Sequence, residues 1–259
     1  MYARSIRALT AAIAAAAVSA VLIVPAAQAA DAVPAYIQAA VADASRPAAD
    51  RDRDANRKPA EVIAFAGIKA GDKIGELMPG GGYFTRILSK TVGAKGVVYT
   101  MSPAPPPAAA NAPARPNPIA AIAAEPGYQN VKVGVLDTSA KLAEPVDLVW
   151  TSLNYHDLAR RPDAEITAMN KMVFDSLKPG GVYLVIDHAS APGAGKSALQ
   201  TLHRIDPEAV KKDILSVGFV LEAESKVLQN LNDPHTIGVH DASMRGTTDQ
   251  FTLKFRKPK

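Results

Sequence analysis

The sequence predicts a doubly wound α/β fold with a mostly parallel sheet, helices on both faces and an antiparallel edge. Two observations lead to this prediction. Strand-like apolar runs alternate with helical patterns about five times, which is typical of parallel strands joined by crossover helices. Two strand patterns then close the chain, as expected where an antiparallel edge is added to a parallel sheet.

Residues 1–29 are expected to be a secretory signal peptide and not part of this fold. Arg4 and Arg7 precede the apolar run 8–24, and Ala27 and Ala29 frame a small-x-small cleavage pattern. The alternative is an uncleaved membrane anchor, but 17 residues rich in alanine lie at the short limit for crossing a bilayer. We therefore expect an exported protein, periplasmic or secreted, without a stable membrane anchor.

Composition favours a single domain that depends on its apolar core. Removal of 29 of the 259 residues leaves 230 and, with two arginines lost, lowers the net charge from +4 to +2. A nearly balanced charge gives no reason to expect a nucleic-acid partner. About 230 residues can bury a full core, and the absence of cysteine means that no disulfide supports it.

An N-terminal helical and charged extension is expected over residues 30–58. A short helix is predicted within 31–44, and 45–58 alternates arginine with aspartate. Such alternation is typical of a solvated helix face with ion pairs. The alternative is a helix that closes over a ligand, with its arginines facing an anion.

The main domain is expected over residues 59–259. Pro59 suits the first turn of a helix, and glycines end that helix before the first strand. Residues 102–126 are too rich in proline for regular structure and predict a surface loop with a brief helix near 119–124. The other elements are predicted as strands 73–77, 97–101, 131–135, 146–151, 182–187, 219–224 and 250–256, and helices 83–91, 164–177 and 205–217.

The segment 72–88 carries the strongest functional signal. Its strand has an acid near its end, Glu76, and a turn with Gly80, Gly81 and Gly82 leads into the next helix. Glycines let the backbone approach a ligand, and the first turn of a helix offers unpaired N–H groups. The sequence therefore predicts a site for the polar end of a nucleotide-like cofactor.

Further polar residues follow the other strands, and ligands of open α/β sheets bind beyond the carboxyl ends of strands. Asp147 begins a strand instead, so we expect it to be structural. The strand-end residues are Met101 and Ser102 after the second strand, Asp137 after the third, 153–157 after the fourth, and Asp187 and His188 after the fifth.

Three runs resemble landmarks of class I S-adenosylmethionine-dependent methyltransferases. They are GELMPGGGYFT at 75–85, DLVWTSLNYHDL at 147–158 and LKPGGVYLVIDH at 177–188. The resemblance covers most of residues 60–256 and is closest to exported bacterial methyltransferases of unknown substrate. It implies a Rossmann-like seven-stranded sheet with an antiparallel last strand, S-adenosylmethionine as the cofactor, and methyl transfer to a small-molecule acceptor.

The resemblance also implies roles for single residues. Gly80 and Gly82, with Gly81 between them, would lie under the methionine part of the cofactor, and Glu76 would hold its ammonium group. Asp137 would lie near the adenine, and Asn154 where the methyl group leaves.

Two departures weaken the likeness. Met78 replaces the first glycine of the family pattern. Met101 or Ser102 stands where an acid normally binds both ribose hydroxyls, and no carboxylate follows before Glu125. A neutral hydrogen bond is worth about 1 kcal/mol, less than a charge-assisted one, so we expect cofactor binding to be about tenfold weaker.

The same missing acid argues against a nicotinamide dinucleotide as the ligand. A dinucleotide-binding turn also needs a third glycine where this chain has Thr85.

His156 is the best candidate for a catalytic base, because neutral imidazole accepts protons near pH 7. Asp157 would orient it and Tyr155 would line the acceptor pocket. His188 and His203 are second choices. The alternative for each histidine is a structural hydrogen bond to the backbone, and His203 with Arg204 would then pin the loop after the fifth strand.

Two rival functions stay open. The chain could be a non-catalytic small-molecule-binding protein on a methyltransferase scaffold, given the missing acid. A metal hydrolase that uses the histidines and aspartates at the strand ends ranks third. The sequence has no HxxxH or HExxH spacing, so we expect no metal. His235 and His240 are expected at the surface.

Overall fold

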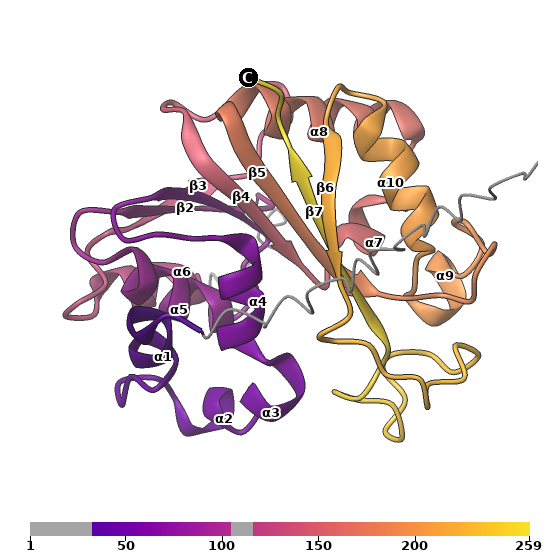
Figure 1. Cartoon of the computed structure of the whole chain (residues 1–259), viewed down its shortest axis with the longest axis horizontal. Helices are drawn as coiled ribbons and strands as arrows, with labels where there is room; N and C mark the ends of the chain where they lie inside the picture. The colour runs from indigo at the N-terminus through magenta and orange to yellow at the C-terminus, as the bar shows by residue number, and fades with distance from the viewer. Residues whose placement is uncertain (1–32, 105–115) are drawn as a thin grey trace, which may run out of the picture. The chain divides into compact units, whose positions relative to one another are not determined.

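Seven strands form one sheet in the order β3-β2-β1-β4-β5-β7-β6 (Figure 1). The computed structural model describes residues 33–104 and 116–259. Only the last strand runs antiparallel to its neighbours, as predicted. The strands are β1 (Lys73–Leu77), β2 (Val97–Ser102), β3 (Val131–Val135), β4 (Val146–Ser152), β5 (Leu177–His188), β6 (Val220–Ser225) and β7 (Gln250–Arg256).

Helices cover both faces of the sheet, and each face has its own apolar core. Alternate residues of β5 divide between them: Tyr183 and Val185 pack with α8 and α10, whereas Leu184 and Ile186 pack with α1, α4 and α5. The helices are α1 (Ala35–Val41), α2 (Ala48–Arg51), α3 (Asp54–Arg57), α4 (Pro59–Ala66), α5 (Tyr83–Val92), α6 (Pro118–Ala124), α7 (Tyr155–Leu158), α8 (Asp163–Ser176), α9 (Leu199–Leu202) and α10 (Pro207–Leu215).

The predicted elements are all present within the described residues. β1, β3 and β7 have the predicted bounds, and the others differ by one or two residues at their ends, apart from β5. That strand begins five residues early, because residues 177–181 continue along β4 through an irregularity between Val146 and Leu148. The single-turn helices α7 and α9 were not predicted, since four residues are too few to show a helical period.

Two predictions fall on residues that the structure does not describe. The signal peptide lies within 1–32, and much of the proline-rich loop lies within 105–115. Among the residues that are described, no helix is long and apolar enough to cross a membrane.

The charged extension differs from the solvated helix that its sequence favoured. It forms two single turns, α2 and α3, and the Arg46 side chain is fully buried. Arg46 donates two hydrogen bonds to the Asp54 carboxylate at 2.7 and 2.8 Å, and the Tyr83 hydroxyl donates to the same carboxylate at 2.6 Å. The hydrogen bond from Tyr83 to the paired Asp54 carboxylate therefore ties the extension to the start of α5.

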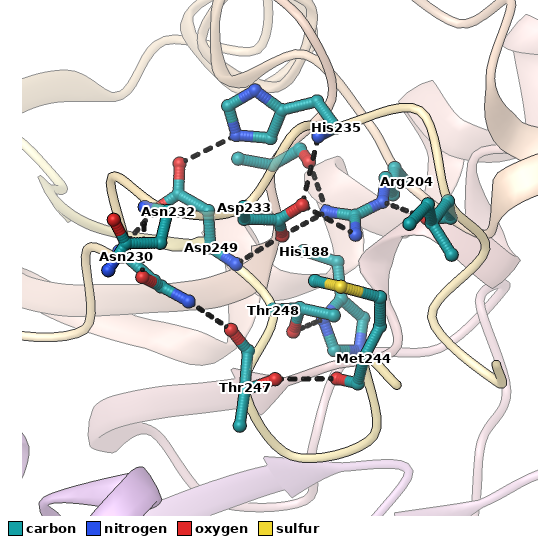
Figure 2. Close-up of polar contacts among 12 residues, drawn as sticks. His188, Arg204, Asn230, Asn232, Asp233, His235, Met244, Thr247, Thr248 and Asp249 are labelled. Atoms are coloured by element: carbon teal, nitrogen blue, oxygen red, sulfur yellow. Dashed lines mark hydrogen bonds and ion pairs between the residues drawn. The ribbon is translucent and has the colours of Figure 1, made fainter. Parts of the chain in front are cut away.

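Residues 226–249, between β6 and β7, form a long loop beside the carboxyl end of β5, and Figure 2 shows the polar contacts that hold it. The Arg204 guanidinium is fully buried and donates to Asp233 at 2.8 and 3.1 Å and to the Ala189 carbonyl at 2.9 Å. Arg204 thus pins the chain after β5, as predicted, and also the loop. The Lys58 ammonium donates to the Val227 carbonyl at 2.7 Å, which links the loop to the extension.

We expect Arg204→Met to destabilise the protein by about 3–5 kcal/mol, because it leaves the buried Asp233 carboxylate without its counter-ion. The matched control is Arg161→Met, which breaks a half-exposed pair with Glu165 and should cost less than about 1 kcal/mol. Urea unfolding followed by the fluorescence of the single tryptophan measures both. Equal losses in the two variants would contradict the role given to Arg204.

Candidate functional site

A pocket of about 350 Å³ opens at the carboxyl ends of β1 and β4. These strands lie where the order of the sheet reverses, which is where open α/β sheets bind ligands. The pocket brings together the acid of β1, the glycine turn, the end of β4 and the extension. Its lining includes Arg53, Arg57, Glu76, Met78, Gly80, Gly81, Tyr83, Phe84, Trp150 and Asn154.

The turn after β1 presents backbone to this pocket. Met78, Gly80 and Gly82 have φ values of 49°, 59° and 87°, in the left-handed region that glycine tolerates best. A side chain added at Gly80 or Gly81 would meet no atom within 4 Å, so both face open space. A side chain at Gly82 would collide with Ile122 of α6, and Gly82 is not part of the pocket lining. The turn therefore offers Gly80 and Gly81 to a ligand, while Gly82 serves packing.

Glu76 is a buried carboxylate that lines the pocket and, among the residues that the structure describes, pairs with no cation. Its side chain accepts a hydrogen bond from the Thr85 hydroxyl at 2.6 Å. Burial raises the pKa of Glu76 to about 7, and the Thr85 hydrogen bond only partly opposes this shift. A ligand cation placed beside Glu76 would stabilise its ionised form.

Asn154 fixes the turn from the other strand. Its amide nitrogen donates to the carbonyls of Leu77 at 3.2 Å and Met78 at 3.1 Å, and its amide oxygen accepts from the Thr151 hydroxyl. These bonds hold the end of β4 against the end of β1 and stabilise the left-handed backbone conformation of the turn.

Two hydrogen-bond donors without partners among the described residues line the same pocket as Glu76, and one of them, Trp150, is the register neighbour of Glu76 on β4. The Arg57 guanidinium stacks on the Tyr83 ring at 4.5 Å and, within the described residues, makes no hydrogen bond or ion pair. Burial, and then the charge of Arg53, lower the pKa of Arg57. The indole N–H of Trp150 is buried and also lacks a partner. Sequence reasoning missed Trp150, because an apolar strand gave no sign that its indole reaches a pocket.

His156 is oriented by a different acid from the one predicted. Asp187 is fully buried and accepts from His156 Nδ1 at 2.7 Å, from the His156 backbone N–H at 2.6 Å and from the His188 backbone N–H at 2.8 Å. Asp157 is partly exposed, pairs with Arg160 at 3.0 Å and lies 3.5 Å from His156 Nε2. The sequence indicated Asp187 as a polar residue at the end of the fifth strand. It did not show that Asp187 contacts His156.

Two other site predictions are wrong because the side chains lie in the core. Tyr155 is fully buried, and its hydroxyl accepts from the Asn170 amide at 2.9 Å, so it cannot line an acceptor pocket. The Met101 side chain packs in the same apolar core and is closed to a ligand. Ser102 ends β2 half-buried, and Asp137 is exposed and accepts from the Ser139 hydroxyl at 2.6 Å.

A second cavity, of about 320 Å³, opens where the chain leaves β2 and β3 on the α8 side of the sheet. Leu136 and Thr138, the neighbours of Asp137, line it together with Leu158 and Met169. The charged side chains of Arg161 and Glu165 also line it, so the cavity offers both apolar and polar contacts.

The remaining histidines gather near the ends of β4 and β5. The ring centroid of His156 lies 5.7 Å from that of His188 and 6.0 Å from that of His203. Burial lowers the pKa of His188 to about 4, and its Nδ1 lies 2.7 Å from the Thr248 hydroxyl (Figure 2). His240 is exposed as predicted, whereas His235 is half-buried and pairs with Asp249 at 2.9 Å. Within the described residues, no three of the histidine and acid side chains could hold a metal ion.

Comparison with known proteins places the fold. No protein-family model and no curated protein sequence matches the chain. A SAM-dependent methyltransferase from Aquifex aeolicus matches its structure with a TM-score of 0.52 and 17% identity, over 78% of this chain and 88% of that one. The fold is that of class I methyltransferases.

Two further solved structures share this fold. The glycopeptide N-methyltransferase MtfA, complexed with S-adenosyl-L-methionine, has a TM-score of 0.51 and 16% identity, over 77% of this chain and 86% of that one. The [4+2]-cyclase SpnF has a TM-score of 0.54 and 16% identity, over 82% of this chain and 81% of that one. The methyltransferase fold therefore also occurs in an enzyme that is named for a different reaction.

We expect the stability of the protein to fall as pH rises, through Glu76. Its pKa is about 7 when folded and about 4.5 when unfolded, so the folded state favours the protonated carboxyl. This contribution is complete below pH 4.5 and is lost as pH rises through 7, a loss of about 2–3 kcal/mol between pH 5 and 8. Urea unfolding at several pH values compares the wild type with Glu76→Gln, which should lack this slope. Parallel curves for the two proteins would contradict the raised pKa.

Proposed function

We propose that the protein transfers a methyl group from S-adenosylmethionine to a small-molecule acceptor. The observation that carries this proposal is the charge arrangement of the pocket at β1 and β4. A buried carboxylate, Glu76, shares the pocket with the Arg57 guanidinium and the Trp150 N–H, which have no hydrogen-bond partner among the described residues, and with Arg53, which pairs with Asp50. An α-amino acid end, with an ammonium and a carboxylate on one carbon, matches both sides of this arrangement.

The methionine end of the cofactor fits the pocket residue by residue. Its ammonium would pair with Glu76, and its carboxylate with the guanidinium groups of Arg57 and Arg53 and the Trp150 N–H. Such charge-assisted hydrogen bonds are roughly twice as strong as neutral ones. Gly80 and Gly81 leave room for the ligand to lie against the turn. The alternative role of the charged extension, arginines that face an anion, is therefore the one we propose.

The adenosine end would follow the carboxyl ends of β2 and β3. In the second cavity, Leu136, Leu158 and Met169 offer an apolar surface to a planar base, and Arg161 and Glu165 offer polar contacts to its edge. The protein has Ser102 where a carboxylate would bind the ribose hydroxyls, and Glu125 does not replace that carboxylate. Both oxygens of Glu125 accept from Arg86 at 2.6 Å. The similar fold of MtfA, which was crystallised with S-adenosyl-L-methionine, supports this ligand.

Calorimetry of the purified protein should detect binding of S-adenosylmethionine and of S-adenosylhomocysteine. Affinity should rise about tenfold from pH 6 to pH 7.5, because only ionised Glu76, whose free pKa is about 7, pairs with the ammonium. Glu76→Gln should bind weakly and lose this pH dependence, whereas the exposed control Lys171→Met should behave as wild type. Absence of binding at millimolar ligand would overturn the proposal.

Arg57→Met should weaken binding of S-adenosylmethionine by tenfold or more, since about 1.5–3 kcal/mol is typical of a hydrogen bond to a charged group. Decarboxylated S-adenosylmethionine lacks the carboxylate, so it shows whether Arg57→Met removes a contact to that group or damages the pocket in general. It should bind the wild type more weakly, and Arg57→Met should cause no further loss. An equal loss for both ligands would show that Arg57 does not contact the carboxylate.

A second candidate is ligand binding without methyl transfer. The absence of an acid at the end of β2, with Glu125 already paired to Arg86, favours it. The sharing of this fold with a [4+2]-cyclase shows that fold alone does not decide between the two. Native mass spectrometry of the purified protein separates them: copurified S-adenosylmethionine or its demethylated product supports methyl transfer, and a different bound molecule supports the second candidate.

A further inference from the structure

The pair formed by His156 and Asp187 lies at the carboxyl ends of β4 and β5, next along the chain and the sheet from Asn154 of the pocket. Ser152 of β4 pairs with Ile186 of β5, so the next residue of β5 is Asp187, beside the turn that leads to Asn154. Asn154 lines the cofactor pocket and begins the single turn α7, which places His156 two residues further on. The imidazole therefore sits at the same corner of the sheet as the pocket.

Asp187 fixes the direction of the His156 ring. One carboxylate oxygen lies 2.7 Å from Nδ1, and the other accepts the His156 backbone N–H at 2.6 Å. Because Asp187 holds both the backbone and the ring of one residue, it leaves the ring a single orientation. An ionised Asp187 accepts hydrogen bonds only, so Nδ1 carries the proton and Nε2 keeps its lone pair.

Nε2 faces groups that are partly open to solvent. The half-exposed Asp157 carboxylate lies 3.5 Å from Nε2, beyond ordinary hydrogen-bond distance, and the half-buried His203 ring lies 6.0 Å from the His156 ring, centroid to centroid. A small molecule that displaces the Asp157 side chain would meet this lone pair.

We infer that His156 takes the proton from the methyl acceptor, that Asp187 positions it, and that the acceptor is a small molecule with a hydroxyl or amine group. This inference rests on the proposed methyl transfer and extends it to the acceptor. An acceptor of this class keeps its proton near pH 7 and becomes a good nucleophile only when a base removes it.

The step balances without a further reactant. The acceptor oxygen or nitrogen forms a bond to the methyl carbon as the carbon–sulfur bond breaks, and the bonding pair stays on sulfur, which loses its positive charge. The acceptor proton passes to His156 Nε2, and the resulting imidazolium later releases it to water. Asp187 stabilises the imidazolium and stays ionised.

The surrounding charges favour this role for His156 over the other histidines. Burial lowers the pKa of His156, but the hydrogen bond and charge of Asp187, helped by Asp157, outweigh burial and raise it, against the opposing charge of Arg160. His188 has its pKa lowered to about 4, and that of His203 is also lowered, chiefly by burial. His156 is therefore the strongest base of the three and the one with an oriented lone pair.

The test measures cofactor binding and methyl transfer separately. Calorimetry gives the affinity for S-adenosylmethionine, and tritiated methyl groups report transfer to three probes: catechol, phenol and benzylamine. His156→Gln should lower transfer to the accepted probe by about 10²-fold or more, with cofactor affinity unchanged within about threefold. Asp187→Asn should lower transfer and shift the acid limb of the pH profile to lower pH. The matched control Asp175→Asn, in the exposed pair with Lys171 of α8, should keep transfer within about threefold of wild type.

Two readouts separate catalysis from a merely structural pair. Added imidazole should restore part of the transfer in His156→Gly, where it can occupy the space of the missing ring. Nitrogen-15 NMR of the wild type should show His156 protonated at Nδ1 when neutral, and this measurement decides even where a variant fails to fold. A neutral His156 protonated at Nε2 would overturn the inference.

The outcomes distinguish this inference from the function on which it rests. Absence of cofactor binding by the wild type would overturn the proposed methyl transfer. Cofactor binding with no transfer to any probe, or with undiminished transfer by His156→Gln, would overturn the inference alone.

Discussion

The candidate site depends on the junction between β1 and β4, the two strands at which the order of the sheet reverses. A turn with three positive φ values, one of them at a methionine, is strained unless its surroundings hold it. Asn154 supplies that support by donating to two carbonyls of the turn, Leu77 and Met78. The same residue begins the helical turn that carries His156. Asn154 therefore supports the pocket-facing backbone with its side chain and, by its place in the chain, begins the turn that carries the proposed base.

The charges in the pocket are arranged for a ligand and not for the free protein. Glu76 and Arg57 both lie in one pocket, yet each lacks an ionic partner within the described residues. Burial accordingly moves the pKa of each toward its neutral form. Unpaired buried charges cost free energy. A ligand with both an ammonium and a carboxylate would pair with Glu76 and Arg57 and remove this cost. The Arg46–Asp54–Tyr83 cluster and the Arg204–Asp233 pair, which are satisfied within the protein, hold the two neighbouring segments in place.

The sequence was sufficient for the sheet but only partly for the site. The order of residues in runs such as 73–77 and 131–135 is enough to show where each strand begins and ends. Glu76 and the glycines after it form a motif that is local in the sequence. Tyr155 and Asp157 were misjudged because residues 155–158 form a single helical turn that sends neighbouring side chains in different directions. Asp187 reaches His156 across 31 residues, and Trp150 faces the pocket from an apolar strand. Contacts of that kind depend on strand register, which no local pattern encodes.

One carboxylate explains why two neighbouring histidines behave oppositely. Asp187 accepts the ring N–H of His156 but only the backbone N–H of His188. At His156 burial lowers the pKa, but the hydrogen bond and charge of Asp187, together with the charge of Asp157, outweigh burial and raise it. At His188 burial lowers the pKa, and the charge of Asp187 only partly opposes this shift. A proton that reaches this corner of the sheet therefore goes to His156. The arrangement raises the pKa of one imidazole and lowers that of its neighbour, and such separation is how paired groups at reactive sites acquire different roles.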